Sequence, residues 1–132
     1  MSETRIPNAA GTRFVQVATL DGLRPGEFRR IAVEGHVLVL ARDGAAVYAF
    51  QSTCPHEMAD LAQGRIDDGC LICPRHLATF RLSDGAVSTG WKNVAPLKLY
   101  PVRIDGNEIT VDAAAVARNP PAGKRQVWDL SR

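Results

Sequence analysis

The sequence lacks the long apolar stretch that a membrane-spanning helix needs. None of its apolar runs approaches the roughly 18 residues required to cross a bilayer, although 45% of its 132 residues are hydrophobic. The N-terminal segment also lacks a basic stretch followed by an apolar one, which a standard secretion signal would show. We therefore expect a protein of the cytoplasm with no membrane partner.

An excess of charge of one sign is also missing. The 16 basic and 14 acidic residues give a formal net charge of only +2, and both signs are interspersed along most of the chain. Nucleic-acid binding normally needs a concentrated basic face, so this balance argues against nucleic acid as the main partner. Cysteine is scarce as well. Three cysteines in a reducing compartment cannot form a disulfide framework, which leaves metal binding or simple burial to explain them.

What the sequence does contain is a series of short apolar runs separated by turn residues. A chain of 132 residues is the size of one domain. Alternating apolar residues bounded by Gly, Asp and Asn are typical of β-strands joined by hairpins. The runs cover residues 14–18, 23–28, 30–33, 36–41, 46–50, 79–82, 86–88, 97–104 and 108–112. The pattern predicts an all-β fold in which the segment between the fifth and sixth runs is an insertion carried on a β scaffold.

Two terminal segments fall outside the β pattern and leave residues 13–112 as the folded domain. Residues 1–12 are polar and irregular, and we expect a flexible N-terminus. Residues 113–132 begin with Ala113-Ala-Ala-Val-Ala, which suits one or two helical turns, before Pro120-Pro121 interrupts them. We expect a C-terminal tail here that packs on the domain, contacts a partner or is disordered.

All three cysteines and two of the three histidines lie close together in the inserted segment. The pattern is Cys54-x-His56 followed by Cys73-x-x-His76, with a proline after each cysteine that favours a loop. Two such loops, each with one thiolate and one imidazole, could meet at a metal site. Zinc sites space their paired ligands by two or more residues, whereas one pair here has a single spacer. That spacing suits a binuclear centre in which one iron takes two sulfurs and the other takes two nitrogens. Zinc stays open as the alternative.

Cys54-Pro-His56 and Cys73-Pro-Arg-His76, in an all-β chain of this size, resemble the ligand motifs of Rieske-type ferredoxins, which hold a 2Fe-2S cluster. The resemblance covers roughly the central β domain. It implies that Cys54 and Cys73 bind the buried iron and that His56 and His76 bind the outer one. It also implies an antiparallel β-sandwich or barrel-like base with a small inserted cluster-binding subdomain at about residues 53–84.

The neighbours of these ligands bear on the reduction potential, which spans about −150 to +300 mV in Rieske centres. In the high-potential respiratory members of the family a disulfide joins the two cluster loops, at positions that are Ala59 and Arg75 here. The same proteins direct serine and tyrosine hydroxyls at cluster sulfurs, where this chain has Ala78 and Phe80. The resemblance therefore implies a potential near the lower end, on the order of −150 mV.

The function that the resemblance implies is electron transfer between proteins. No second metal-binding motif is present, so we expect neither a terminal oxygenase nor any other enzyme. We expect a monomer that carries electrons from an NADH-dependent flavoprotein reductase to a terminal oxygenase. His76-Leu-Ala-Thr-Phe80 and Cys54-Pro-His-Glu are similar to the ferredoxins of toluene, alkene and isoprene monooxygenases, whose hydroxylase is a diiron protein. The ferredoxin of a ring-hydroxylating dioxygenase and the small Rieske subunit of an assimilatory nitrite reductase stay open as alternatives.

Other residues near the ligands are candidates for supporting roles. Cys70 forms a formal Cys-x-x-Cys pair with Cys73, but the resemblance places it on a short strand that leads into the second loop, and we do not expect it to be a ligand. We expect His36 to be a solvated turn residue. The candidates for an apolar collar around the cluster are Met58, Leu77 and Trp91. The residues predicted to form a rim of mixed charge are Glu57, Asp60, Arg65, Asp67, Asp68, Arg75 and Arg81.

Overall fold

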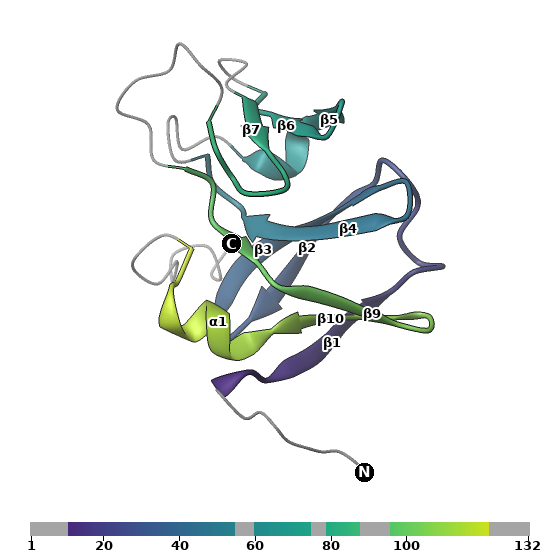
Figure 1. Ribbon diagram of the computed structural model, residues 1–132, viewed down its shortest axis with the longest axis vertical. Coiled ribbons are helices and arrows are strands. Elements are labelled where there is room, and N and C mark those ends of the chain that lie inside the picture. The colour runs from purple at the N-terminus through teal and green to yellow at the C-terminus, as the bar shows by residue number, and fades with distance from the viewer. Residues whose placement is uncertain (1–10, 55–59, 75–78, 88–95, 122–132) are drawn as a thin grey trace.

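The structure is a computed structural model of the 132-residue chain and describes residues 11–54, 60–74, 79–87 and 96–121. Within these ranges three antiparallel sheets lie one above another (Figure 1). In spatial order they are the lower sheet, β1 (Phe14–Thr19), β10 (Glu108–Asp112) and β9 (Val102–Asp105); the middle sheet, β2 (Phe28–Val33), β3 (His36–Asp43), β4 (Ala46–Gln51) and β8 (Leu99–Tyr100); and the small sheet, β5 (Arg65–Asp67), β6 (Cys70–Ile72) and β7 (Thr79–Arg81). The predicted all-β fold is confirmed. No helix in the described ranges is long and apolar enough to cross a membrane.

The middle sheet is covered on both of its faces. Along β3, Leu38 and Leu40 pack into the apolar cluster shared with the lower sheet, which we call the base cluster. Val39 and Ala41, which alternate with them, pack into a second cluster shared with the small sheet, which we call the upper cluster. Side chains of a strand point alternately to its two faces, so a strand buried on both sides reads as one continuous apolar run. This explains why residues 37–41 carry no polar residue.

The hairpin between β2 and β3 has a two-residue turn, Glu34-Gly35. Val33 pairs with His36, and both turn residues have positive φ, 53° at Glu34 and 76° at Gly35. That combination is the one that matches the right-handed twist of the two strands. Glu34 is a poor residue for this conformation, and its carboxylate accepts a hydrogen bond from the Arg13 guanidinium at 2.5 Å. The contact links the turn of the middle sheet to the segment that enters the lower sheet.

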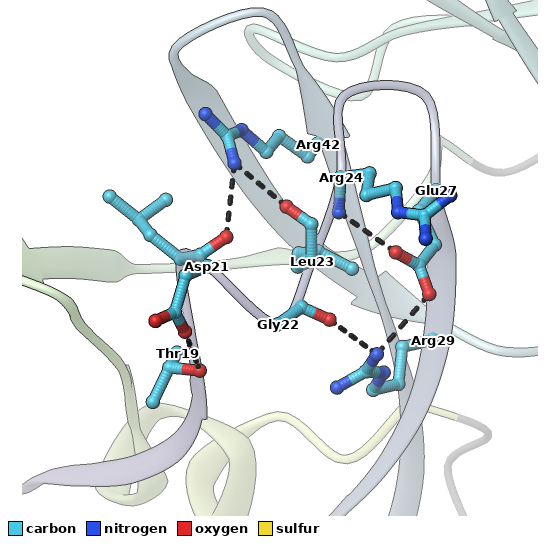
Figure 2. Close-up of polar contacts among 9 residues, drawn as sticks. Thr19, Asp21, Gly22, Leu23, Arg24, Glu27, Arg29 and Arg42 are labelled. Atoms are coloured by element: carbon cyan, nitrogen blue, oxygen red, sulfur yellow. Dashed lines mark hydrogen bonds and ion pairs between the residues drawn. The ribbon is translucent and has the colours of Figure 1, made fainter.

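The predicted strand over residues 23–28 is wrong except at its last residue, where β2 begins. The connection between β1 and β2 is a loop that two arginines hold in place (Figure 2). Arg42 donates to the carbonyls of Leu20 and Leu23 at 3.0 and 2.8 Å, and Arg29 donates to the carbonyl of Gly22. Leu23 is fully buried in the base cluster. The apolar residue that suggested a strand is therefore an anchor for a loop, and side-chain donors replace the missing backbone pairs.

Residues 97–104, predicted as one strand, form two strands that belong to different sheets. β8 pairs with β4 in the middle sheet, whereas β9 pairs with β10 in the lower sheet. Pro101 lies between them. Proline has no N–H to donate to a ladder, so the pairing ends there and the chain crosses to the other sheet. The carbonyl of Pro101 accepts from the N–H of Asp112 at 3.1 Å, which keeps the crossing close to β10.

Helix α1 (Ala113–Arg118) follows β10 directly and belongs to the folded core. Ala113 and Val116 are buried in the base cluster. Asp112 begins the helix: its carboxylate accepts from the N–H of Ala114 at 3.0 Å and from the N–H of Arg13 at 2.8 Å. The helical turns expected at the start of residues 113–132 are therefore present, and this part of the predicted tail packs on the domain.

The role of Asp112 gives a first prediction. Asp112→Ala removes a buried acceptor of two backbone N–H groups, so we expect it to lower the free energy of unfolding by about 1–2 kcal/mol. Urea denaturation followed by circular dichroism measures this value. Asp105→Ala is the matched control, because Asp105 is exposed at the end of β9. Equal effects of the two substitutions would contradict the capping role.

Candidate metal centre

Each expected ligand segment is a loop closed at its base by an antiparallel residue pair. Thr53 pairs with Asp60 around the first segment, and Ile72 pairs with Thr79 around the second. A cysteine stands directly after the first residue of each pair. The two loops therefore have the same length and carry their sulfur at the same position. Backbone pairing marks where each loop starts and ends.

The two predicted sulfur ligands, Cys54 and Cys73, are both completely buried, with 0% exposure. They belong to the upper cluster, between the middle sheet and the small sheet. Other members of this cluster are Phe50, Leu61, Leu71, Phe80, Leu82 and Leu97. Soft thiolate ligands suit zinc, Cu(I) and iron–sulfur clusters, and an apolar shell around them excludes solvent. The chemistry of this donor pair fits a sulfur-ligated iron.

The two predicted nitrogen ligands, His56 and His76, lie outside the described residues. The other predicted positions that lie outside them are Glu57, Met58, Ala59, Arg75, Leu77, Ala78 and Trp91. Phe80 is described: it is fully buried on β7 and presents no hydroxyl toward the site. The set of four ligands stays a prediction. Only its two cysteines lie among the described residues.

The end of the first loop is fastened to the middle sheet. Asp60 caps a short 3-10 helix, Leu61–Gln63, by accepting from the N–H of Ala62 at 3.0 Å. Its other carboxylate oxygen is ion-paired with Arg30 of β2. The N–H of Leu61 donates to the carbonyl of Ser52 at 2.8 Å, directly before the loop. Asp60, predicted as a rim charge, is thus a structural residue that joins the first loop to the middle sheet.

Two glycines, Gly64 beside β5 and Gly85 after β7, allow backbone segments to approach closely at the small sheet. A Cβ at Gly64 would lie 2.4 Å from the carbonyl oxygen of Ile72, the residue before Cys73. A Cβ at Gly85 would lie 2.2 Å from the carbonyl oxygen of Leu97, and Gly85 also has a φ of +80°. Leu97 in turn donates its N–H to the carbonyl of Gly85 at 2.8 Å. At both positions only glycine lets the two backbones come this close.

The turn after β7 is held by an ion pair. Asp84 accepts from Nε and Nη2 of Arg81 at 2.9 and 2.6 Å and from the N–H of Ala86 at 3.0 Å. The hydrogen bonds from Arg81 hold the pKa of Asp84 well below its ordinary value, at about 2. Two of the predicted rim charges, Asp60 and Arg81, are therefore engaged in ion pairs within the chain. Arg65, Asp67 and Asp68 are exposed on the small sheet.

Cys70 lies on the strand where it was predicted, whereas His36 is not in the environment predicted for it. Cys70 begins β6, as predicted, where it is half-buried and pairs with Arg81, so the strand lies between it and Cys73. The solvated turn predicted for His36 is wrong. His36 begins β3 with an exposure of 7%, and its Nδ1 has no hydrogen-bond partner among the described residues. The turn itself is completed by Gly35, and β3 begins at His36, where the predicted run 36–41 begins.

Residues 13–101 match the family described as the Rieske [2Fe-2S] domain. Because the match covers more than half of the sequence, the chain belongs to this family. Its cofactor is accordingly the Rieske 2Fe-2S cluster. The predictions of the family, the fold and the cofactor are confirmed.

Two curated relatives are ferredoxin components of oxygenase systems. The biphenyl dioxygenase ferredoxin subunit of Pseudomonas sp. (strain KKS102) is 28% identical over 105 residues, which cover 79% of this chain and 95% of that protein. The ferredoxin component of the alkene monooxygenase system of Xanthobacter autotrophicus (strain ATCC BAA-1158 / Py2) is 29% identical over 108 residues, which cover 80% and 87%. The two identities are nearly equal, although the oxygenase classes differ.

Solved structures agree with this likeness. The ferredoxin of carbazole 1,9a-dioxygenase from Nocardioides aromaticivorans IC177 is 37% identical with a TM-score of 0.68, covering 75% of this chain and 96% of that one. A chain in a complex of reduced oxygenase and oxidized ferredoxin of carbazole 1,9a-dioxygenase is 28% identical with a TM-score of 0.67, covering 76% and 93%. A putative nitrite reductase NADPH small subunit is 25% identical with a TM-score of 0.67, covering 75% and 97%.

The close approach at Gly85 gives a second prediction. Gly85→Ala and Gly69→Ala both place an alanine at positive φ, +80° and +76°, but only the first meets another backbone. We expect Gly69→Ala to cost about 1–2 kcal/mol of stability from backbone strain. Gly85→Ala should cost about 1–3 kcal/mol more, because the carbonyl of Leu97 must move.

Urea denaturation of the two variants checks this difference. Iron content after purification is the second measurement, because Leu97 packs in the same cluster as the two cysteines. A Gly85→Ala protein as stable as Gly69→Ala would show that the small sheet is not seated on Leu97 through this contact.

Proposed function

We propose that this chain is a low-potential electron carrier that receives single electrons from an NADH-dependent flavoprotein reductase and delivers them to a terminal oxygenase in the cytoplasm. The observation that carries the proposal is the pair of buried cysteines, each at the start of a loop closed by a backbone pair. The fold around them is one shared with ferredoxin components of oxygenase systems. An electron carrier needs no substrate site of its own, so we propose no enzymatic activity.

The proposed ligands are Cys54 and Cys73 for the inner iron and His56 and His76 for the outer iron. When bound, the Rieske cluster takes up and releases one electron at a time. The residues of the chain supply the surroundings. The upper cluster keeps water from the two sulfurs, and the closed bases of the loops hold them at fixed positions. Fixed ligands lower the rearrangement that each transfer requires.

The proposed potential is near the lower end of the Rieske range, on the order of −150 mV. Hydrogen bonds to cluster sulfurs raise the potential because they stabilise the reduced, more negative state. Phe80, at the position of a hydroxyl donor in high-potential members, is buried and has no hydrogen to donate. This value suits an electron donor of flavin type.

A diiron hydroxylase of an aromatic or alkene monooxygenase is our first proposal for the electron acceptor. It rests on the Cys54-Pro-His-Glu and His76-Leu-Ala-Thr-Phe80 segments and is supported by the alkene monooxygenase relative. The terminal component of a ring-hydroxylating dioxygenase is the second candidate, supported by the ferredoxins of biphenyl and carbazole dioxygenases. Nitrite reduction is a third, supported by the nitrite reductase small subunit at 25% identity.

Reconstitution decides between these acceptors. The purified holoprotein is mixed with NADH, the flavoprotein reductase of its own operon, and in turn a diiron hydroxylase, a ring-hydroxylating oxygenase and a sirohaem nitrite reductase from the same genome. We expect NADH oxidation coupled to product formation with an oxygenase, and none when the holoprotein is omitted. Coupling to nitrite reduction alone would replace the proposal with the third candidate. A colourless protein containing one zinc ion would reject electron transfer altogether.

The ligand assignment gives a further prediction, for which the chain supplies its own control. Cys54→Ser and Cys73→Ser each remove a proposed sulfur ligand, so we expect at least about tenfold less bound iron. Cys70→Ser makes the same chemical change on the neighbouring strand β6, and there we expect full iron content and an unchanged EPR spectrum. Iron analysis and EPR of the dithionite-reduced proteins measure both. Loss of iron from Cys70→Ser, or its retention in Cys73→Ser, would contradict the assignment.

A further inference from the structure

Gln51 is a buried polar residue at the point where the middle sheet gives way to the ligand loops. It is the last residue of β4, three positions before Cys54, and only 6% of its surface is exposed. A buried amide costs stability unless its donors and acceptor find partners. The partners of this amide show what the residue does.

The side chain of Gln51 bridges two backbone segments. Its Oε1 accepts from the N–H of Lys98 at 2.7 Å, and its Nε2 donates to the carbonyl of Thr53 at 2.7 Å. Its own backbone N–H donates to the carbonyl of Lys98 at 3.1 Å. The orientation of the amide is determined by its neighbours, because the N–H of Lys98 can only donate and the carbonyl of Thr53 can only accept.

These two segments are the connections between the base and the small sheet. The chain leaves the middle sheet through residues 52–54 and returns to it through residues 96–98 before β8. Gln51 is hydrogen-bonded to both. On the return side, Leu97 is buried in the upper cluster and donates its N–H to the carbonyl of Gly85, in the turn after β7. One side chain thus joins the departing and the returning segments, and the neighbouring Leu97 links the returning segment to the turn after β7.

The bond to Thr53 bears directly on the first sulfur ligand. The carbonyl of Thr53 and the N–H of Cys54 belong to one planar peptide unit, so a donor that fixes the carbonyl also fixes the direction of that N–H and the position of the Cys54 Cα, from which the side chain starts. Groups that orient metal ligands tune the metal, and hydrogen bonding around the sulfurs sets the potential of an iron–sulfur cluster.

We propose that Gln51 is a positioning residue for the cluster, which sets the orientation of Cys54 and couples it to the returning strand at Lys98. The inference rests on the proposed function, since it requires that Cys54 binds the inner iron. It assigns to a residue outside the ligand motif an effect on how tightly the cluster is held and on its reduction potential.

The test compares Gln51→Leu and Gln51→Asn with matched substitutions at Gln63. Leucine removes both side-chain hydrogen bonds at similar volume, and asparagine keeps a neutral amide that is too short to reach both partners. Gln63 lies in the 3-10 helix after the first loop and is exposed, so Gln63→Leu and Gln63→Asn make the same changes without this bridge. None of the four variants adds a charge near the cluster.

Three properties of the purified holoproteins are measured: the rate of cluster loss to an iron chelator, the midpoint potential, and the g values of the reduced cluster by EPR. For Gln51→Leu we expect about tenfold faster cluster loss, a shifted potential and altered g values. For Gln51→Asn we expect smaller changes in the same direction. Both Gln63 variants should match the wild type. If Gln51→Leu does not fold, the same three measurements on Gln51→Asn decide whether Gln51 positions the cluster.

The possible failures are distinguishable. Lower thermal stability of the Gln51 variants with unchanged g values, potential and rate of cluster loss would overturn the positioning role, because it would show a purely structural bond. A wild-type protein that binds no 2Fe-2S cluster would overturn the proposed function and this inference together. A loaded wild type whose Gln51 and Gln63 variants behave alike would overturn the inference alone.

Discussion

Burial of both faces of the middle sheet is the constraint on which the rest of the structure depends. The base cluster below it and the upper cluster above it share the strands β3 and β4, whose residues alternate between the two. A shift of register by one residue would exchange the two sets of side chains. The middle sheet therefore fixes the lower sheet on one side and, on the other, the small sheet together with the buried Cys54 and Cys73. The metal centre is a consequence of how this sheet is covered.

The shape of the site depends mainly on contacts between backbone groups. The ligand loops are closed by Thr53 with Asp60 and by Ile72 with Thr79, Gly64 allows the close approach to Ile72, and Gly85 allows the contact with Leu97. Side chains enter where backbone pairing ends: Asp60 with Arg30 beside the first loop, and Gln51 between the two connecting segments. Removing water from two sulfurs requires such a closed shell, because an exposed backbone group would bring water with it.

The sequence predicted what depends on local patterns and missed what depends on distant contacts. Alternation located most strands of the base, and the cysteine and histidine spacing indicated the cofactor. The sequence did not show that the strand predicted across Pro101 divides between two sheets. It also did not show that Leu23 anchors a loop through Arg42. Both features depend on partners far along the chain. Gln51 carries no sequence signal at all, since its partner Lys98 lies 47 positions away. The positions of His56 and His76 stay predictions.

Buried residues hold the fold together, which leaves exposed residues for the recognition of a partner. The choice of partner is therefore separated from the fold. Ferredoxins of a dioxygenase and of a monooxygenase system are 28% and 29% identical to this chain, so overall likeness carries no preference between them. The buried residues are occupied in holding the sheets and the two sulfurs. If the chain serves a reductase and an oxygenase as proposed, their recognition uses exposed side chains, and those described on the small sheet include Arg65, Asp67 and Asp68. Charges of both signs suit the brief encounters that the proposed carrier needs with two partners in turn.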